Sequence, residues 1–376
     1  MARKKKEAPN YAESVSALLA VAGEFQHGPG RIALTEEAVR LADANNDEQL
    51  GYFARHELID AAIFGGAPEV AIVAYAWCLA YFDKHPNPDE LDPYNLLWKY
   101  KWVVGHSVNY PSIPRGQIEE LFEDMKRRYE EAGFGLNAVY KVMREVYRTM
   151  GDMKAARAAQ ALVSKTARDA LSDCAACVQH SLMKYYFDVG KPDRAMQMAE
   201  PIVEGRMKCA EVPHCTYGHL LLPELFAGRP DVAADYHRRG VKLLRLQSGF
   251  LHEASQHLIF LAVTDNLLPA KRYLEKHLLE AVTTNCPGWQ FEFANAAAFA
   301  LERIAQLPKP PRIKIAPGVV LPEDLDATDP SALRDHFALQ ARELAILFDE
   351  RNRTKHFTKR MKETKKLHGR VTPVKV

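Results

Sequence analysis

Four of the six cysteines lie within 42 residues, and their spacing could hold a metal ion. Cys174 and Cys177 are separated by two alanines, a spacing that lets both thiolates reach one ion. Cys209 and His214 can supply a second pair of ligands. Three thiolates and one imidazole would complete a tetrahedral site with no position left for water. The sequence therefore predicts a structural zinc held by Cys174, Cys177, Cys209 and His214.

Other interpretations of this cluster remain open. Cys215 or His180 could replace His214 as the fourth ligand. The cysteines could instead be reduced and partly buried, because a free cysteine packs as a small hydrophobe. Metal- or thiol-dependent catalysis is a third possibility. We expect the two remaining cysteines, Cys78 and Cys286, to be structural.

Three histidines fall on successive expected helices, but their register does not match. His180, His219 and His257 precede the alanines at 195, 233 and 270 by 15, 14 and 13 residues. Each residue of drift rotates a helical position by about 100°. A strict line of three histidines is therefore not expected, and packing histidines are the default interpretation.

Basic and aromatic residues alternate on two of the expected helices. They could line a groove for an acidic or C-terminal peptide, with the cations contacting carboxylates and the tyrosines acting as anchors. The predicted partner-binding residues are Lys141, Arg144, Tyr147, Arg148, Lys184 and Tyr185. The alternative is that they form ordinary solvated helix faces.

Motifs typical of enzymes are missing from the sequence. It contains no glycine-rich phosphate loop, dinucleotide-binding fingerprint, nucleophile elbow or paired-histidine protease motif. We therefore expect a non-enzymatic protein.

A regular spacing of turns indicates the architecture that positions these residues. A turn residue is followed five positions later by alanine at Gly66, Gly151, Gly190, Gly228 and Asp265. The last four turns are 39, 38 and 37 residues apart, which is typical of stacked helical hairpins. The sequence predicts an all-α solenoid of about six to seven hairpins. In such a stack, both cysteine pairs precede the first helix of neighbouring units, so one metal could bridge them.

The chain divides into a repeat region with extensions at both ends. A basic tail (1–9) precedes the solenoid (10–306), in which Thr35 is expected to cap a helix through Ala44. A proline-rich stretch (307–330) is either a linker or an extended segment lying on the solenoid. Ser331 is expected to cap a single long helix (331–362). A second basic tail (363–376) follows, with disorder expected after Lys366.

The repeat unit resembles the tetratricopeptide repeat family. Ala195 occupies the small position early in the second helix, and Leu182 and Tyr186 match apolar and aromatic positions of the first. The resemblance covers about residues 48–285, lacks the preferred tryptophan and terminal proline, and implies a right-handed solenoid. A narrower resemblance, to bacterial tetratricopeptide-type proteins without an assigned activity, rests on segments 173–177, 205–214 and 257–264. It implies that Cys174, Cys177, Cys209 and His214 act together.

Charge is segregated along the chain although the net charge is only +2. Residues 1–6 carry four basic groups, and residues 351–376 carry ten basic groups and one acidic group. Such ends could bind nucleic acid or another anionic surface, or simply aid solubility. The sequence shows neither a secretory signal nor an apolar run long enough to span a membrane. We expect a cytoplasmic protein whose main partner is a protein or peptide.

Overall fold

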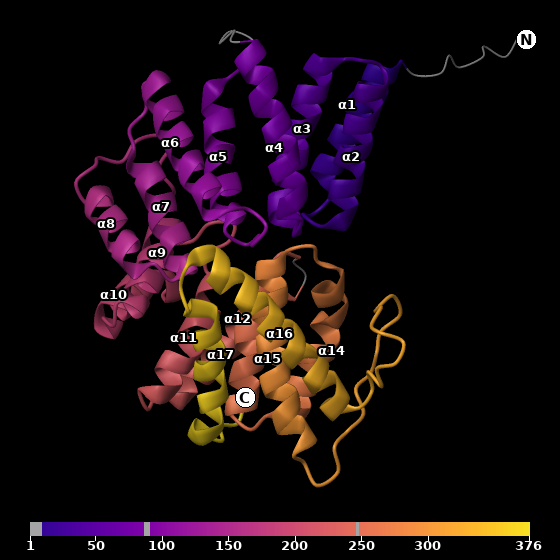
Figure 1. The fold of residues 1–376 in the computed structure, drawn as a ribbon, viewed down its shortest axis with the longest axis vertical. Coiled ribbons are helices and arrows are strands. Elements are labelled where there is room, and N and C mark those ends of the chain that lie inside the picture. The colour runs from indigo at the N-terminus through magenta and orange to yellow at the C-terminus, as the bar shows by residue number, and fades with distance from the viewer. Residues whose placement is uncertain (1–9, 86–90, 246–247) are drawn as a thin grey trace, which may run out of the picture. The chain divides into compact units, whose positions relative to one another are not determined.

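The computed structural model describes residues 10–85, 91–245 and 248–376, and these residues form an all-α protein (Figure 1). They fold into seventeen α-helices and one 3-10 helix, and no strand occurs in the described ranges. The predicted basic tail 1–9 lies outside them. The chain divides into two compact units, residues 1–103 with 247–249 and residues 104–246 with 250–376. The division falls inside helix α5.

In the first unit α1 packs on α2, α2 on α3 and α3 on α4. Its core includes Val15, Ala38 and Ala54, all fully buried. The tyrosines of α4 and α5 also contribute, since Tyr75 stacks on Tyr100. The helices are α1 (Tyr11–Glu24), α2 (Pro29–Ala44), α3 (Glu48–Gly65), α4 (Pro68–Lys84) and the start of α5 (Pro93–Ser107).

The second unit begins with helical hairpins and ends with three helices that pack in sequence. Within it, α7 packs on α8, α9 on α10, α11 on α12 and α13 on α14, whereas α15 contacts α13, α14 and α16. The hairpin helices are α6 (Arg115–Glu131), α7 (Asn137–Met150), α8 (Met153–Val163), α9 (Ala175–Asp188), α10 (Pro192–Val203), α11 (His214–Phe226), α12 (Pro230–Leu244), α13 (Leu251–Val263) and α14 (Leu267–Thr283). The last three are α15 (Pro287–Ala305), α16 (Pro330–Asn352) and α17 (His356–Lys366).

All five turns predicted from the sequence have the expected backbone. The four glycines and Asp265 adopt positive φ, a conformation that glycine tolerates best. The alanine five residues after each turn is 0% exposed in every case. A methyl group at this position therefore lets two helices approach closely, as the repeat spacing predicted.

Two helix starts differ from the sequence-based expectation. Thr35 does not cap a helix, because α2 begins six residues earlier, with Pro29 at its first position. The Thr35 hydroxyl instead donates to the carbonyls of Arg31 and Ile32 within the helix. Likewise, Asp329 and not Ser331 caps α16, where its side chain accepts from the amide of Ala332 at 2.9 Å.

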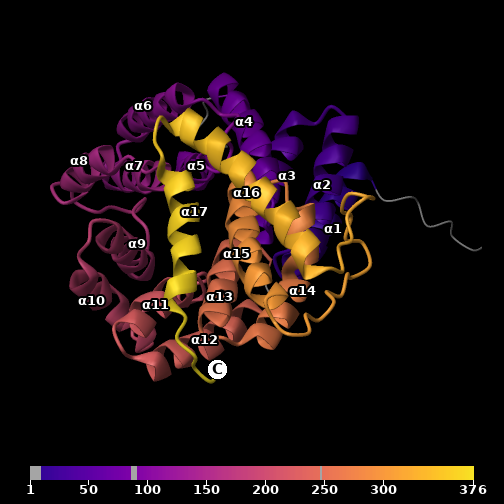
Figure 2. The ribbon, with the colours of Figure 1, turned by 60° about the horizontal axis from the view of Figure 1, so that its bottom comes forward.

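The single long helix predicted for 331–362 is two helices. Arg353 adopts a left-handed conformation (φ 57°) that ends α16, and α17 starts at His356 in a new direction (Figure 2). Asp349 fixes this corner, since its carboxylate accepts from the amides of Phe357 at 2.8 Å and Thr358 at 3.0 Å. A side chain eight residues upstream therefore caps α17, which the helical periodicity did not indicate.

The predicted basic tail 363–376 is ordered, so the expected disorder after Lys366 is wrong. A 3-10 helix (Leu367–Arg370) follows α17, and the amides of Thr372 and Val374 then donate to the carbonyls of Val263 and Thr264. The last carbonyls of a helix lack intrahelical partners, and these belong to the end of α13. The tail thus satisfies groups that would otherwise need water.

The proline-rich segment 307–330 lies against α14, consistent with the second of its two interpretations. Ile313 is buried, and its amide donates to the carbonyl of Thr328. The amide of Lys314 donates to the carboxylate of Glu275 at 2.6 Å.

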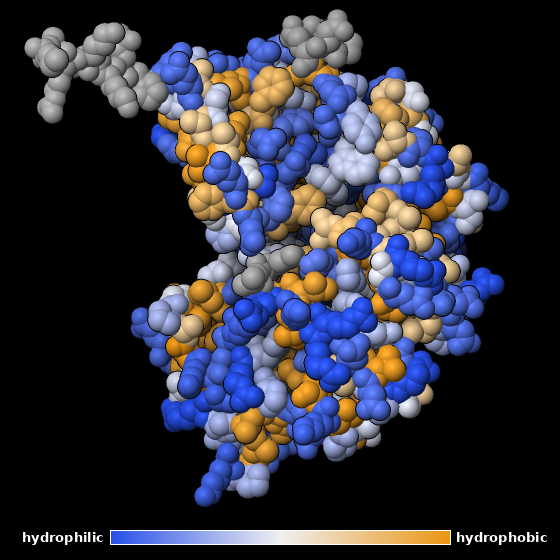
Figure 3. Space-filling model, turned by 180° about the vertical axis from the view of Figure 1, so that it is seen from behind, coloured by the Kyte–Doolittle hydropathy of each residue, from blue (hydrophilic) through white to orange (hydrophobic). Residues whose placement is uncertain are grey.

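Hydrophilic and hydrophobic residues are interspersed on the face drawn in Figure 3. None of the described helices combines the length and apolar character needed to cross a membrane.

Candidate metal centre

Three of the four predicted metal ligands come together in the second unit. The sulfur atoms of Cys174, Cys177 and Cys209 lie within 4.8 Å of one another, and Cys177 and Cys209 are 3.4 Å apart. Cys174 and Cys177 occupy the start of α9, and Cys209 lies in the loop between α10 and α11. Two neighbouring hairpins therefore contribute to one cluster, as the turn spacing predicted.

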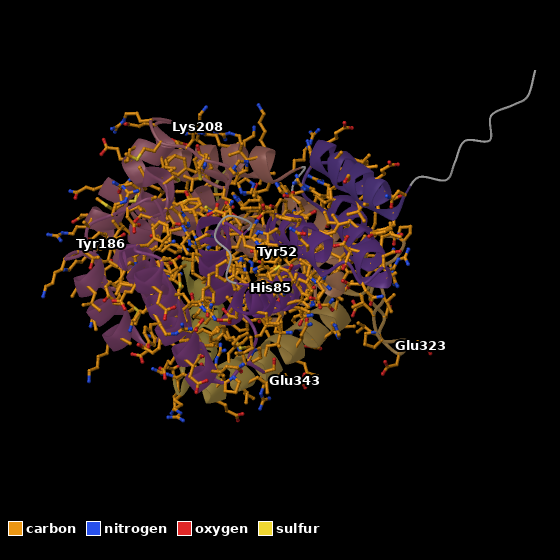
Figure 4. All side chains as sticks on the ribbon, turned by 90° about the horizontal axis from the view of Figure 1, so that it is seen from above. Tyr52, His85, Tyr186, Lys208, Glu323 and Glu343 are labelled. Atoms are coloured by element: carbon orange, nitrogen blue, oxygen red, sulfur yellow. The ribbon has the colours of Figure 1, made fainter. Side chains whose placement is uncertain are left out.

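The loop that carries Cys209 is shaped by backbone hydrogen bonds. Gly205 ends α10 in a left-handed conformation, and the amide of Met207 turns back to the carbonyl of Pro201 at 2.9 Å. The amide of Cys209 then donates to the carbonyl of Val212 at 2.9 Å. Lys208, which precedes Cys209 in the chain, is exposed and lies at the edge of the view in Figure 4. The loop thus turns one side chain outward and the next toward α9.

The start of α9 favours the thiolate form of one cysteine. Cys174 is the N-cap of the helix, and its sulfur accepts from the amide of Cys177 at 3.4 Å. Burial opposes ionisation, but this amide and the neighbouring thiols outweigh it and lower the pKa of Cys174. Burial and the nearby Cys209 raise the pKa of Cys177. A bound cation would offset the penalty for ionising Cys177, because metal ligation requires thiolates.

His214, the fourth predicted ligand, does not join the three sulfur atoms within the described residues. Its ring stacks on Phe250, with centroids 5.7 Å apart. Cys215 packs with Cys177 and Cys209 around a buried apolar cluster, whereas Nδ1 of His180 lies 3.1 Å from the hydroxyl of Thr216. Neither Cys215 nor His180 joins the three sulfur atoms within the described residues, but Cys215 packs on the same apolar cluster as two of them.

The predicted partner-binding cations are paired inside the protein. Lys141 lies 2.6 Å from Asp173, Arg148 lies 2.8 Å from Asp188, and Lys184 lies 3.4 Å from Glu145. Burial alone would raise the pKa of Glu145, but the surrounding cations hold it well below its usual range. Each of these three charges is thus already balanced by a carboxylate.

The remaining predicted partner-binding residues also have internal contacts. Arg144 is 1% exposed and donates to the hydroxyl of Ser181 at 2.6 Å. The ring of Tyr147 packs edge-on against Phe122, and the buried Tyr185 lies beside Arg144. Recognition of an acidic peptide by these six residues stays a prediction, and it would require their internal contacts to change.

The three histidines of the expected helices fall into two separate groups. The rings of His180, His219 and His252 follow one another with centroids 5.6 Å apart. His257 is fully buried elsewhere, with its Nδ1 3.0 Å from Nδ1 of His237. The register argument against a line through His257 is therefore confirmed. His252 was not predicted from the sequence. The available signal was its spacing of one helical turn from Gln256, which places both residues on the same face of a helix.

Comparisons with protein-family models and with curated proteins found no match to this chain.

Proposed function

We propose that the protein is a non-enzymatic scaffold of tetratricopeptide type that binds a protein or peptide and is stabilised by one structural zinc. Its helix pairs would stack as a right-handed solenoid of about six to seven hairpins. The positive-φ turns and the fully buried alanines support this stacking. So do the contacts between the first helices of neighbouring hairpins, α7 with α9 and α11 with α13.

The observation that carries the proposal is the convergence of Cys174, Cys177 and Cys209 from two hairpins. Thiolates are the ligands that structural zinc sites prefer, and such sites contribute directly to folding stability. With Cys215 as the fourth ligand, the ion would have no open position. Zinc would then act as a clamp between the α9 and α11 hairpins. Its role would be structural, and none of its ligands would take part in catalysis.

Metal analysis of the full-length protein tests this clamp. We expect zinc bound by thiolates, and Cys209→Ser should lose it and lower the melting temperature. Cys78→Ala is the matched control, because Cys78 is a fully buried cysteine outside the cluster. It should lose stability but keep the zinc. A folded wild-type protein that takes up no thiolate-bound metal after reduction would contradict the clamp.

Partner binding is best placed on α16, which presents an exposed apolar stripe. Leu339 is 56% exposed, and about two helical turns further along the adjacent Ile346 and Leu347 are 41% and 50% exposed. Glu343, labelled in Figure 4, lies at the edge of that view and is four residues from both Leu339 and Leu347. Contiguous exposed apolar residues with a polar surround are typical of protein interaction sites.

Affinity purification from the source lysate tests this placement. We expect a specific protein to be recovered with the wild type and lost with Leu339→Ser/Leu347→Ser. Val320→Ser serves as the control, because Val320 is 81% exposed but lies outside α16. A partner retained by the double variant would exclude the stripe, and the absence of any specific partner would count against the scaffold.

The nucleic-acid alternative has less support. In the basic C-terminal segment of the chain, Arg360 forms a bidentate ion pair with Glu292, and Arg370 lies over the ring of Phe226 at 3.5 Å. Both cations are thereby engaged within the protein, whereas binding to phosphates would need them to face outward.

A further inference from the structure

A second group of metal-ligating atoms lies in the same unit and uses different chemistry. His219 on α11 and the adjacent pair His252 and Glu253 on α13 place one ligand atom each within 4.8 Å of one another. All three side chains are half-buried. The helices α11 and α13 pack against each other, which fixes the distance between the contributing turns. None of these residues belongs to the thiol cluster.

Both imidazoles direct a nitrogen toward one point. The side-chain nitrogen of Gln256 lies 2.9 Å from Nδ1 of His219 and 3.2 Å from Nε2 of His252. A single amide group is therefore held between two ring nitrogens, each of which can accept from it. The oxygen of the same amide is buried against Gly218 without a hydrogen-bond partner. A buried orphan oxygen of this kind calls for an explanation.

An outer carboxylate faces the other ring nitrogen of His252. This nitrogen, Nδ1, lies 3.5 Å from Glu292, and Arg360 holds Glu292 with two hydrogen bonds of 2.7 and 2.5 Å. A carboxylate that accepts the Nδ1 proton leaves Nε2 with a free lone pair. This outer carboxylate is a recurrent feature of metal-binding histidines, since it orients the ring and raises its basicity.

From these contacts we propose that His219, His252 and Glu253 bind a divalent transition-metal ion, with Glu292 as the positioning residue of His252. Two imidazoles and one carboxylate suit Zn²⁺ and Fe²⁺. On metal binding the Gln256 amide gives up its place between the two rings. Three protein ligands leave at least one position for water or an exchangeable ligand, so this site differs in kind from a closed thiolate site. The proposal does not depend on the scaffold function.

Titration of the reduced, metal-free, full-length protein with Co²⁺ tests the proposal. Sulfur-to-cobalt charge-transfer bands report the thiol cluster, whereas visible d–d bands without charge transfer report nitrogen and oxygen ligands. We expect Cys209→Ser to remove the first signal and leave the second. Glu253→Gln should remove the second and leave the first. Glu253→Gln is nearly isosteric and changes no imidazole, so it provides a variant that is expected to fold.

Two further variants separate metal binding from a hydrogen-bond network. Glu292→Gln should weaken Co²⁺ binding at the nitrogen and oxygen site by about 10- to 100-fold without abolishing it. His85→Ala, which changes an exposed histidine of the first unit, should leave both signals unchanged. A folded wild-type protein that shows only the sulfur signal would overturn the proposal. So would a nitrogen and oxygen signal that persists in Glu253→Gln.

Discussion

Gly151, Gly190 and Gly228 occupy equivalent positions in three turns, yet their steric surroundings differ. All three have φ between 71° and 78°, where a side chain is strained. A methyl group added at Gly190 or Gly228 would meet no atom within 4 Å, whereas at Gly151 it would overlap the Cβ of His356. Because the backbone strain is similar at the three glycines and the packing differs, comparing substitutions at them measures the effect of packing.

We predict that Gly151→Ala destabilises the protein more than the two equivalent changes do. Gly190→Ala and Gly228→Ala should each cost about 1–2 kcal/mol, the usual penalty for a left-handed alanine. Gly151→Ala should cost roughly 1–3 kcal/mol more, since the overlap is with the near end of a side chain at the start of α17. Urea unfolding of the three variants measures the difference. Equal losses would show that α17 moves away freely.

At the residue scale, the sequence predicted local conformation better than it predicted partners. The left-handed turns follow from glycine itself, and the repeat spacing placed Cys177 near Cys209 before the structure was known. No local rule excluded His214 as a metal ligand, because the orientation of its imidazole depends on stacking against the ring of Phe250. His252 was missed because its neighbour His219 lies 33 residues away and no shared motif joins them.

Among the elements, the corner between α16 and α17 depends most on a single side chain. Asp349 is 8% exposed and accepts from two amides and the hydroxyl of Thr358. These amides belong to the first turn of α17, whose N-cap residue, Lys355, makes no side-chain capping hydrogen bond.

We predict that Asp349→Ala loosens α17 and lowers the free energy of unfolding by about 1–3 kcal/mol, because buried donors lose their acceptor. Asp335→Ala, on an exposed part of α16, is the matched control and should change stability by less than about 0.5 kcal/mol. Hydrogen exchange at the amides of Phe357 and Thr358 gives the local readout. Unchanged protection of these amides in Asp349→Ala would contradict the capping role.

The helices themselves were largely predictable, but this corner was not. Helix ends marked by glycine and proline, such as Gly190 before α10, could be located from the sequence because both residues act locally. The α16–α17 corner contains neither residue. It forms because a distant carboxylate caps α17 and because Phe357 stacks on Phe348. The only signal in the sequence was the end of the apolar stripe at Phe348.

On the scale of the whole chain, two arginines of the basic C-terminal segment are engaged inside the fold. The C-terminal residues look like a basic tail, yet Arg360 pairs with Glu292, and Arg351 donates to the carbonyls of Val108 and Tyr110. Burial and the nearby Arg115 lower the pKa of Arg351 to about 10, still far above neutral pH. These two arginines therefore contribute to packing, which a count of charges cannot reveal.

Neutral buried histidines give the stability of the whole molecule a defined dependence on pH. Burial lowers the pKa of His106 to about 4, and burial together with Arg238 lowers that of His237 to about 4. Burial and the neighbouring histidines also lower the pKa of His257 well below its usual value. An unfolded histidine titrates near 6.5, so between about pH 6.5 and 4 the unfolded chain binds more protons than the folded one. The stabilisation is complete above this window and is lost as the pH falls through it.

We therefore predict that the midpoint of urea unfolding falls steadily from pH 6.5 to 4.5 at constant ionic strength, and that it changes little from pH 7.5 to 6.5. His106→Gln removes one titrating group while keeping a polar side chain beside Asn109, whose amide lies 3.4 Å from the ring. This variant should be less stable at pH 7.5 but lose less on acidification. His85→Ala, at an exposed position, should follow the wild-type profile. A wild-type profile that is flat between pH 6.5 and 4.5 would show that these histidines take up protons without unfolding.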